Sequence, residues 1–167
     1  MTTILIRAED VQEYLSAAGG AAIPITRPLR NQPRGAQTYL GYVWEYRPTK
    51  ARLFASITPK DADHLQEFDR YAPMQPGDVI PIREPWFLIR RDPSGSVLIR
   101  YAEGEERTLT PPEGDEVKTQ WPGRWQGARG MYLWMCRLQA RIHSAECRKV
   151  DGVWSWVYSA TIERIAG

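Results

Sequence analysis

Cysteine and histidine are both scarce in this chain of 167 residues. The cysteines are Cys136 and Cys147, and the histidines are His64 and His143. Two cysteines are too few for a disulfide framework, and these four residues lack the spacing of zinc ligands. We therefore expect no structural metal and assign no cofactor.

Long apolar runs are also absent. No run approaches the length that a bilayer-spanning helix needs, and the N-terminus lacks a signal-peptide pattern. A cytoplasmic protein without a membrane partner is therefore expected. Hydrophobic residues make up 43% of the chain and charged residues 25%, which excludes a largely disordered protein. The length favours a single domain over residues 1–167.

Net charge is small as well. A formal charge of +2 does not by itself indicate a nucleic-acid partner. However, 18 of the 22 basic residues are arginine, whose planar guanidinium suits phosphates and base edges and stacks on aromatic rings. A GC-rich genome would produce the same bias, so both explanations stay open.

The most informative stretch is residues 76–86. Its Pro-Gly-Asp start predicts a turn, and the β-rich run that follows predicts a strand. Period-two geometry sends Ile80 and Ile82 toward a core and leaves Glu84 and Trp86 near its mouth. Because Pro81 has no N–H, it indicates an edge position or a bulge.

Other local patterns predict two short helices, three hairpins and one long loop. Glu9 and Asp10 are expected at a helix N-terminus, the residues from Val11 to Ala18 carry the apolar stripe of that helix, and Gly19-Gly20 ends it. A second helix is expected from Pro59 and Asp61 through Phe68. The predicted hairpins join 38–46 to 51–57, 86–90 to 97–101, and 132–150 to 153–164. The last hairpin turns at Asp151-Gly152 and has an expected β-bulge near His143-Ser144. A long loop is expected over 103–130.

Four motifs, in order, resemble those of phage-type ASCH domains in the PUA-like superfamily. They are Thr26-Arg27 after the first helix, Arg83-Glu84-Pro85-Trp86 after Pro-Gly-Asp, Met131 to Leu138 at the entry of a long strand, and Trp154 to Tyr158 with Ile162-Glu163-Arg164 in the last strand. The resemblance implies an α+β fold, a mixed β-barrel with two short helices. Residues 37–72 have no counterpart in the family pattern and are expected to be an insertion.

The resemblance also implies a cleft lined by arginine, carboxylate and aromatic side chains. Such a set suits a nucleotide, because arginine binds phosphate, an indole stacks on a base and a carboxylate accepts from a base amino group. An alternative reading makes the tryptophans core residues and Arg83-Glu84 a salt-bridged strand end. The candidate binding residues are Thr26, Arg27, Arg83, Glu84, Trp86, Trp134 and Arg137, with Trp121 and Arg124 from a loop. That loop, which also holds Trp125 and Arg129, is basic and aromatic, a composition that single-stranded nucleic acid favours.

The first functional prediction is a non-catalytic module, of phage or prophage type, that binds RNA, single-stranded nucleic acid or a modified nucleotide. Family members that hydrolyse an acylated cytidine carry a lysine where this chain has Ile23, so no catalytic residue is assigned. One alternative is a nucleoside amidohydrolase or ribonuclease, with Glu84 as acid–base and Thr26 or Arg27 polarising the substrate. Another is a phage protein that binds a host protein.

Overall fold

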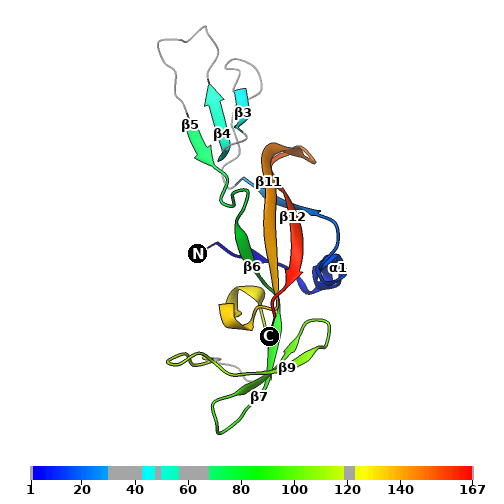
Figure 1. The fold of residues 1–167 in the computed structure, drawn as a ribbon, viewed down its shortest axis with the longest axis vertical. Coiled ribbons are helices and arrows are strands. Elements are labelled where there is room, and N and C mark those ends of the chain that lie inside the picture. The colour runs from blue at the N-terminus through cyan, green and yellow to red at the C-terminus, as the bar shows by residue number, and fades with distance from the viewer. Residues whose placement is uncertain (1, 30–42, 48–49, 57–67, 119–122, 167) are drawn as a thin grey trace. The chain divides into compact units, whose positions relative to one another are not determined.

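The computed structural model describes residues 2–29, 43–47, 50–56, 68–118 and 123–166 (Figure 1). The chain divides into two compact units. The first unit comprises residues 1–21, 80–140 and 162–167, and the second unit comprises residues 22–79 and 141–161. The prediction of a single domain stays a prediction.

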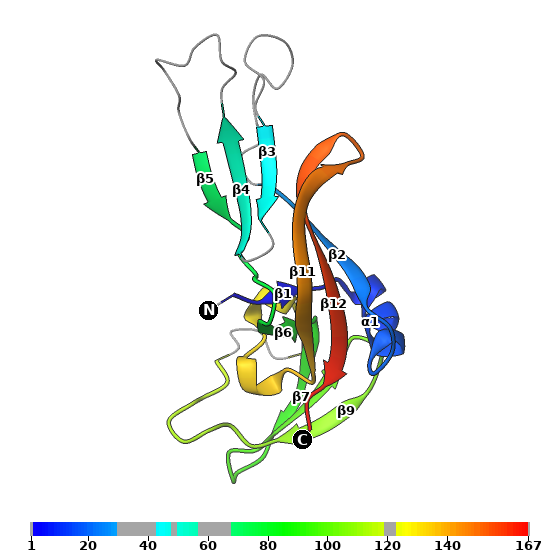
Figure 2. The same cartoon turned by 45° about the horizontal axis from the view of Figure 1, so that its top comes forward.

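Most described elements are strands, with one α-helix and three 3-10 turns (Figure 2). They are β1 (Ile4–Leu5), η1 (Ala8–Asp10), α1 (Val11–Ala17), β2 (Ile23–Pro28), β3 (Val43–Arg47), β4 (Lys50–Ser56), β5 (Phe68–Tyr71), β6 (Val79–Arg83), β7 (Trp86–Arg91), β8 (Val97–Tyr101), β9 (Glu106–Leu109), β10 (Trp125–Gln126), η3 (Ala128–Gly130), η4 (Leu133–Met135), β11 (Leu138–Val150) and β12 (Val153–Arg164). The α+β class is confirmed.

The strands form three sheets, with orders β1-β6-β11-β12-β2, β10-β7-β8-β9 and β3-β4-β5. Within the described ranges each sheet is open, so the expected closed barrel is not seen. Strand β2, at one edge of the largest sheet, contains Pro24 and Pro28. Proline removes a ladder donor and is typical of edge strands, which gives a physical reason why pairing ends there.

The first helix is confirmed close to its expected bounds. Residues 8–10 form a 3-10 turn and α1 then runs to Ala17, burying Val11 and Tyr14. Gly19 follows with φ of 79°, a conformation that glycine adopts without strain, and its N–H donates to the carbonyl of Ile162 at 2.8 Å. The second predicted helix falls largely outside the described residues, but Phe68 begins strand β5 rather than ending a helix.

Strand β6 confirms the predicted inward phase, since Ile80 and Ile82 are buried. Parallel pairing with β1 begins at Ile82, one residue after Pro81. Glu84 and Trp86 differ from the prediction: each is 1% exposed, and neither lies at an open mouth. For Trp86 the cause is packing, because it belongs to a hydrophobic core that β7 and β8 share with Met131 and Met135.

The hairpin of β7 and β8 is confirmed. The expected loop over 103–130 is partly regular, since β9 pairs with β8, β10 pairs with β7, and η3 follows. The strand expected from Tyr132 begins only at Leu138. Met135 N–H donates to Tyr132 O at 3.0 Å and Cys136 N–H to Leu133 O at 3.1 Å, so this segment closes a 3-10 turn instead.

The second unit confirms three local predictions. Burial along β11 changes phase between Ile142 and Ala145, as the sequence pattern predicts, while the bulge itself stays a prediction. Asp151 and Gly152 both have positive φ, 49° and 78°, as a tight two-residue hairpin turn requires. The hairpin predicted from residues 38–57 is also present, because β3 and β4 pair antiparallel.

Candidate functional site

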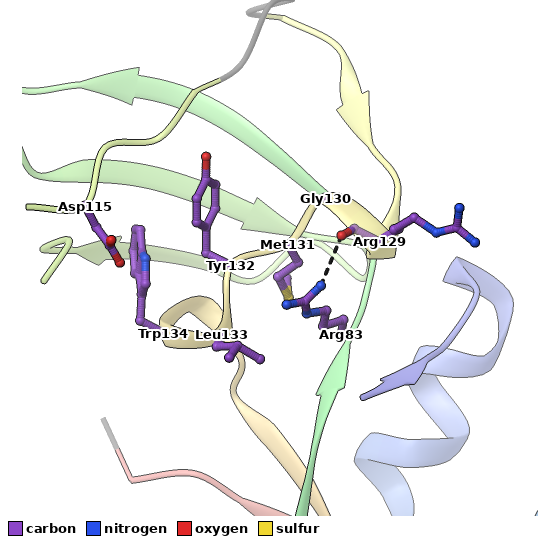
Figure 3. Close-up of a pocket in the computed structure, with 8 residues that line it drawn as sticks. All are labelled: Arg83, Asp115, Arg129, Gly130, Met131, Tyr132, Leu133 and Trp134. Atoms are coloured by element: carbon purple, nitrogen blue, oxygen red, sulfur yellow. Dashed lines mark hydrogen bonds between the residues drawn. The ribbon is translucent and has the colours of Figure 1, made fainter. Parts of the chain in front are cut away.

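A pocket of about 410 Å³ opens in the first unit (Figure 3). Arg83 contributes to it from the end of β6 and Asp115 from the loop after β9, while residues 129–134 supply the rest of its lining. Two successive 3-10 turns, η3 and η4, shape that last segment. Each turn begins after an extended residue, Gly127 or Tyr132, so the chain changes direction twice within a few residues.

The pocket has an aromatic wall. The rings of Tyr132 and Trp134 lie 5.7 Å apart between centroids and are tilted by 34°. Trp86 meets Tyr132 edge-on, with centroids 6.5 Å apart and planes at 73°, and the Tyr132 hydroxyl accepts a hydrogen bond from the Lys118 N–H at 2.9 Å. These contacts hold Tyr132 in place and leave a planar, apolar surface beside the cavity.

Positive charge in the pocket comes from Arg129 and from Arg83. One of its terminal nitrogens, Nη1, donates to the carbonyl of Arg129 at 3.2 Å (Figure 3). Within the described part of the chain, neither Arg83 nor Arg129 forms an ion pair with a carboxylate. The positive charge of the Arg83 guanidinium is therefore not neutralised by an ion pair with any described carboxylate.

Two donors in the pocket lining are buried and have no partner among the described residues. They are Nε of Arg83 and Nε1 of Trp134. Both groups can only donate, and buried donors without a partner are rare in folded proteins because each costs free energy. Nε1 of Trp86 and the hydroxyl of Tyr158, outside the lining, are in the same state. A polar group that reached the two lining donors would have to supply an acceptor.

A buried ionic cluster lies next in sequence to the pocket residues. The guanidinium of Arg137 donates from Nε and Nη2 to the two carboxylate oxygens of Glu84, at 2.7 and 2.9 Å, and also contacts Glu103 and Glu105. Its Cζ atom lies 4.2 Å from the ring centroid of Tyr101, whose hydroxyl donates to Met135 O at 2.7 Å. The cluster therefore supports η4, which forms part of the pocket lining.

Electrostatics in this cluster follow from burial and pairing. Burial raises the pKa of Glu84, although the hydrogen bonds and charge of Arg137 oppose the rise. Burial alone would lower the pKa of Arg137, but its bonds to Glu84 and Glu103 outweigh that effect and raise it. Arg137 therefore stays charged, and both Glu84 oxygens are engaged with it.

The structure brings some of the predicted site residues together and separates others. Arg83 and Trp134 line the pocket, Trp86 packs against its aromatic wall, and Glu84 and Arg137 form the adjacent ion pair. Thr26 and Arg27 lie on β2 in the second unit, Arg124 is exposed just before β10, and Trp121 falls outside the described residues.

Sequence reasoning missed several residues of the pocket lining. Asp115 lies in the stretch expected to be an irregular loop, and Tyr132 lies in the stretch expected to be a strand. Arg129 was noted in the basic, aromatic loop but was not assigned to the site. The alternation of apolar residues from Tyr132 onward concealed the 3-10 turn. No pattern in the sequence singled out Asp115.

No model of a known protein family matches the chain. Searches among curated proteins and among solved structures found no match either. Among the described residues, no three histidine, cysteine, aspartate or glutamate side chains are grouped closely enough to hold a metal ion. No helix in the same ranges is both long enough and apolar enough to cross a membrane.

Proposed function

We propose that this protein is a non-catalytic binding module for single-stranded nucleic acid or a modified nucleotide, and that the pocket of the first unit is its binding site. One observation carries the proposal: the un-neutralised guanidinium of Arg83 shares a cavity with the aromatic pair Tyr132 and Trp134. Charge for a phosphate and a flat surface for a base are the two features that nucleotide recognition needs.

Each pocket residue has a distinct role in this proposal. Arg83 and Arg129 bind phosphate oxygens, and Trp134 supports the base with Tyr132 behind it. Asp115 accepts a hydrogen bond from an exocyclic amino group, since a carboxylate is an acceptor only. The volume of about 410 Å³ is within the usual range of small-molecule sites.

The likeness to phage-type ASCH and PUA-like domains is part of the same proposal. It is supported by the order of the motifs, and by the ion pair between Glu84 and Arg137, which joins two of the motif segments. A non-catalytic role is supported by Ile23 at the position of the family's lysine. It is also supported by the burial of Glu84, whose carboxylate oxygens both accept hydrogen bonds from Arg137.

The direct test is fluorescence anisotropy with labelled single-stranded RNA, single-stranded DNA and duplex DNA at two salt concentrations. We expect binding to single strands that weakens as salt rises, because phosphate contacts release counterions. Arg83→Ala and Trp134→Ala should each weaken binding at least about 5-fold, the low end for one base–aromatic stack or charged contact.

Arg164→Ala is the matched control, because Arg164 is an exposed arginine of the same unit and its loss changes net charge equally. It should bind within about twofold of the wild-type protein. Absence of binding to all three nucleic acids and to free nucleotides would overturn the proposal. So would an equal loss in Arg164→Ala and Arg83→Ala, because the binding would then be a diffuse charge effect.

A further inference from the structure

A second aromatic pair lies on the four-stranded sheet of the first unit. Trp125 on β10 pairs with Phe87 on β7, and their ring centroids are 5.7 Å apart with planes at 59°. Trp125 is 51% exposed, the largest exposure of any large hydrophobic residue in the described ranges, and Phe87 is partly exposed. One exposed indole alone is ordinary, but an indole and a phenyl ring in contact on one sheet face form a small apolar patch, and such patches often mark interaction sites.

The two faces of this sheet differ sharply. Trp86, Leu88, Ile99 and Tyr101 are buried on one face. The alternating residues are more exposed, and one row across the sheet runs from Trp125 through Phe87 and Arg100 to Glu106. Arg100 and Glu106 form an exposed ion pair at one end of that row. The other end of the row is apolar, because it consists of Trp125 and Phe87.

The two strands that carry this aromatic pair lie next to the pocket lining in the sequence. Strand β10 leads through Gly127 into η3, where Arg129 and Gly130 line the pocket (Figure 3). Strand β7 begins shortly after Arg83, which also lines it. Both strands that carry the exposed aromatic pair therefore adjoin segments of the pocket lining, and Arg83 and Arg129 contribute positive charge that no described carboxylate pairs with.

We propose that Trp125 and Phe87 form a second base-stacking platform, so that the ligand is a single-stranded oligonucleotide rather than a free mononucleotide. The inference rests on the proposed function of the pocket. One nucleotide occupies the pocket, and a neighbouring base of the same strand stacks on the exposed indole. Partly exposed aromatic residues on an open sheet are a recurrent way to bind unpaired bases, whereas bases inside a duplex are already stacked and paired.

The test compares a nucleoside monophosphate with RNA and DNA single strands of increasing length on the full chain. Affinity of the wild-type protein should rise from the monophosphate to strands of a few nucleotides. Trp125→Ala should weaken strand binding about 5- to 150-fold, the range of one base–aromatic stack, and leave monophosphate binding within about twofold. Trp125→Phe, which keeps a ring, should retain part of the gain.

Trp154→Ala serves as the matched tryptophan control in the second unit and should change neither affinity by more than about twofold. Two results would overturn the second stacking platform while leaving the proposed role of the pocket intact. One is that Trp125→Ala binds single strands as tightly as the wild-type protein does. The other is that a monophosphate binds the wild-type protein as tightly as the longest strand does. A wild-type protein that binds neither strands nor monophosphates would overturn the proposed function itself. Comparing the affinities for RNA strands and DNA strands shows which of the two nucleic acids the protein prefers.

Discussion

Arg137 and Glu84 form a bidentate ion pair with N–O distances of 2.7 and 2.9 Å. The side chain of Arg137 is 1% exposed and that of Glu84 is 2% exposed. The two residues are 53 positions apart in sequence, so the pair links the chain just after β6 to the chain just before β11. Buried charges are tolerated only when they are paired and hydrogen-bonded. This link therefore holds two segments that flank the pocket.

Removing the cation from this pair should be costly. Arg137→Met leaves Glu84 buried without its partner, and we expect a loss of about 3–5 kcal/mol in the free energy of unfolding. The double variant Arg137→Met with Glu84→Met should recover much of that loss, because it removes both buried charges. Urea unfolding at neutral pH measures both values.

Arg148→Met is the control, since its ion pair with Glu146 lies between side chains that are 58% and 51% exposed. Its effect should stay within about 0.5 kcal/mol. Equal stabilities of Arg137→Met and Arg148→Met would contradict a structural role for the buried pair.

The hairpin turn of the second unit depends on backbone conformation. Gly152 has φ of 78°, so Gly152→Ala should lower the free energy of unfolding by about 1–2 kcal/mol, although a Cβ there would meet no atom within 4 Å. Gly127 has φ of −69° and equally open surroundings, and Gly127→Ala should be close to neutral. A neutral Gly152→Ala in thermal unfolding would show that the turn is not formed as described.

Stability should fall at alkaline pH through the buried tyrosines. Burial raises the pKa of Tyr158 from 10.0 to about 12, so in that window the folded state keeps a proton that the unfolded state has lost. Since the folded state then binds more protons, the contribution of Tyr158 is complete below pH 10 and declines as pH rises toward 12. Urea unfolding at pH 9 and 11 should show a smaller decline for Tyr158→Phe, and an identical decline would contradict this assignment.

Base preference should depend on Asp115. If its carboxylate accepts from an exocyclic amino group, cytosine- or adenine-containing strands should bind about 5- to 150-fold more tightly than uracil strands, the range of one good base contact. Asp115→Ala should remove that preference without abolishing binding. Glu113→Ala, an exposed carboxylate of the same loop, should keep it. Competition binding with homopolymers measures the ratio, and a preference that survives in Asp115→Ala would refute the role.

Features set by local sequence were predictable. Three elements follow from residues that are close in sequence: the Asp151-Gly152 turn, the β7–β8 hairpin and the helix before Gly19. In each, the preferred φ angles or the spacing of apolar residues are compatible with few other local structures. The phase change near His143 was likewise visible, because apolar residues shift from even to odd positions along the strand.

The pocket was less predictable, because its shape depends on a 3-10 turn and on distant partners. Tyr132, Trp134 and Cys136 alternate like strand residues, yet backbone bonds over three residues close η4. The alternation of residues predicted that Glu84 shares the phase of the core residues, but it did not predict that Glu84 is fully buried. That burial is possible because Glu84 forms an ion pair with Arg137. Arg83 and Trp134 were predicted from chemistry and resemblance, whereas Asp115 became visible only in three dimensions.

The most direct test of the pocket as a nucleotide site is the indole N–H region of a ¹H–¹⁵N NMR spectrum during titration with a short single-stranded RNA. The chain has seven tryptophans, and Trp134→Phe identifies the Trp134 signal. Because Nε1 of Trp134 has no partner among the described residues, its signal should shift on binding, while that of buried Trp156 in the second unit stays in place. A titration that saturates without moving the Trp134 signal would contradict the assignment of the site.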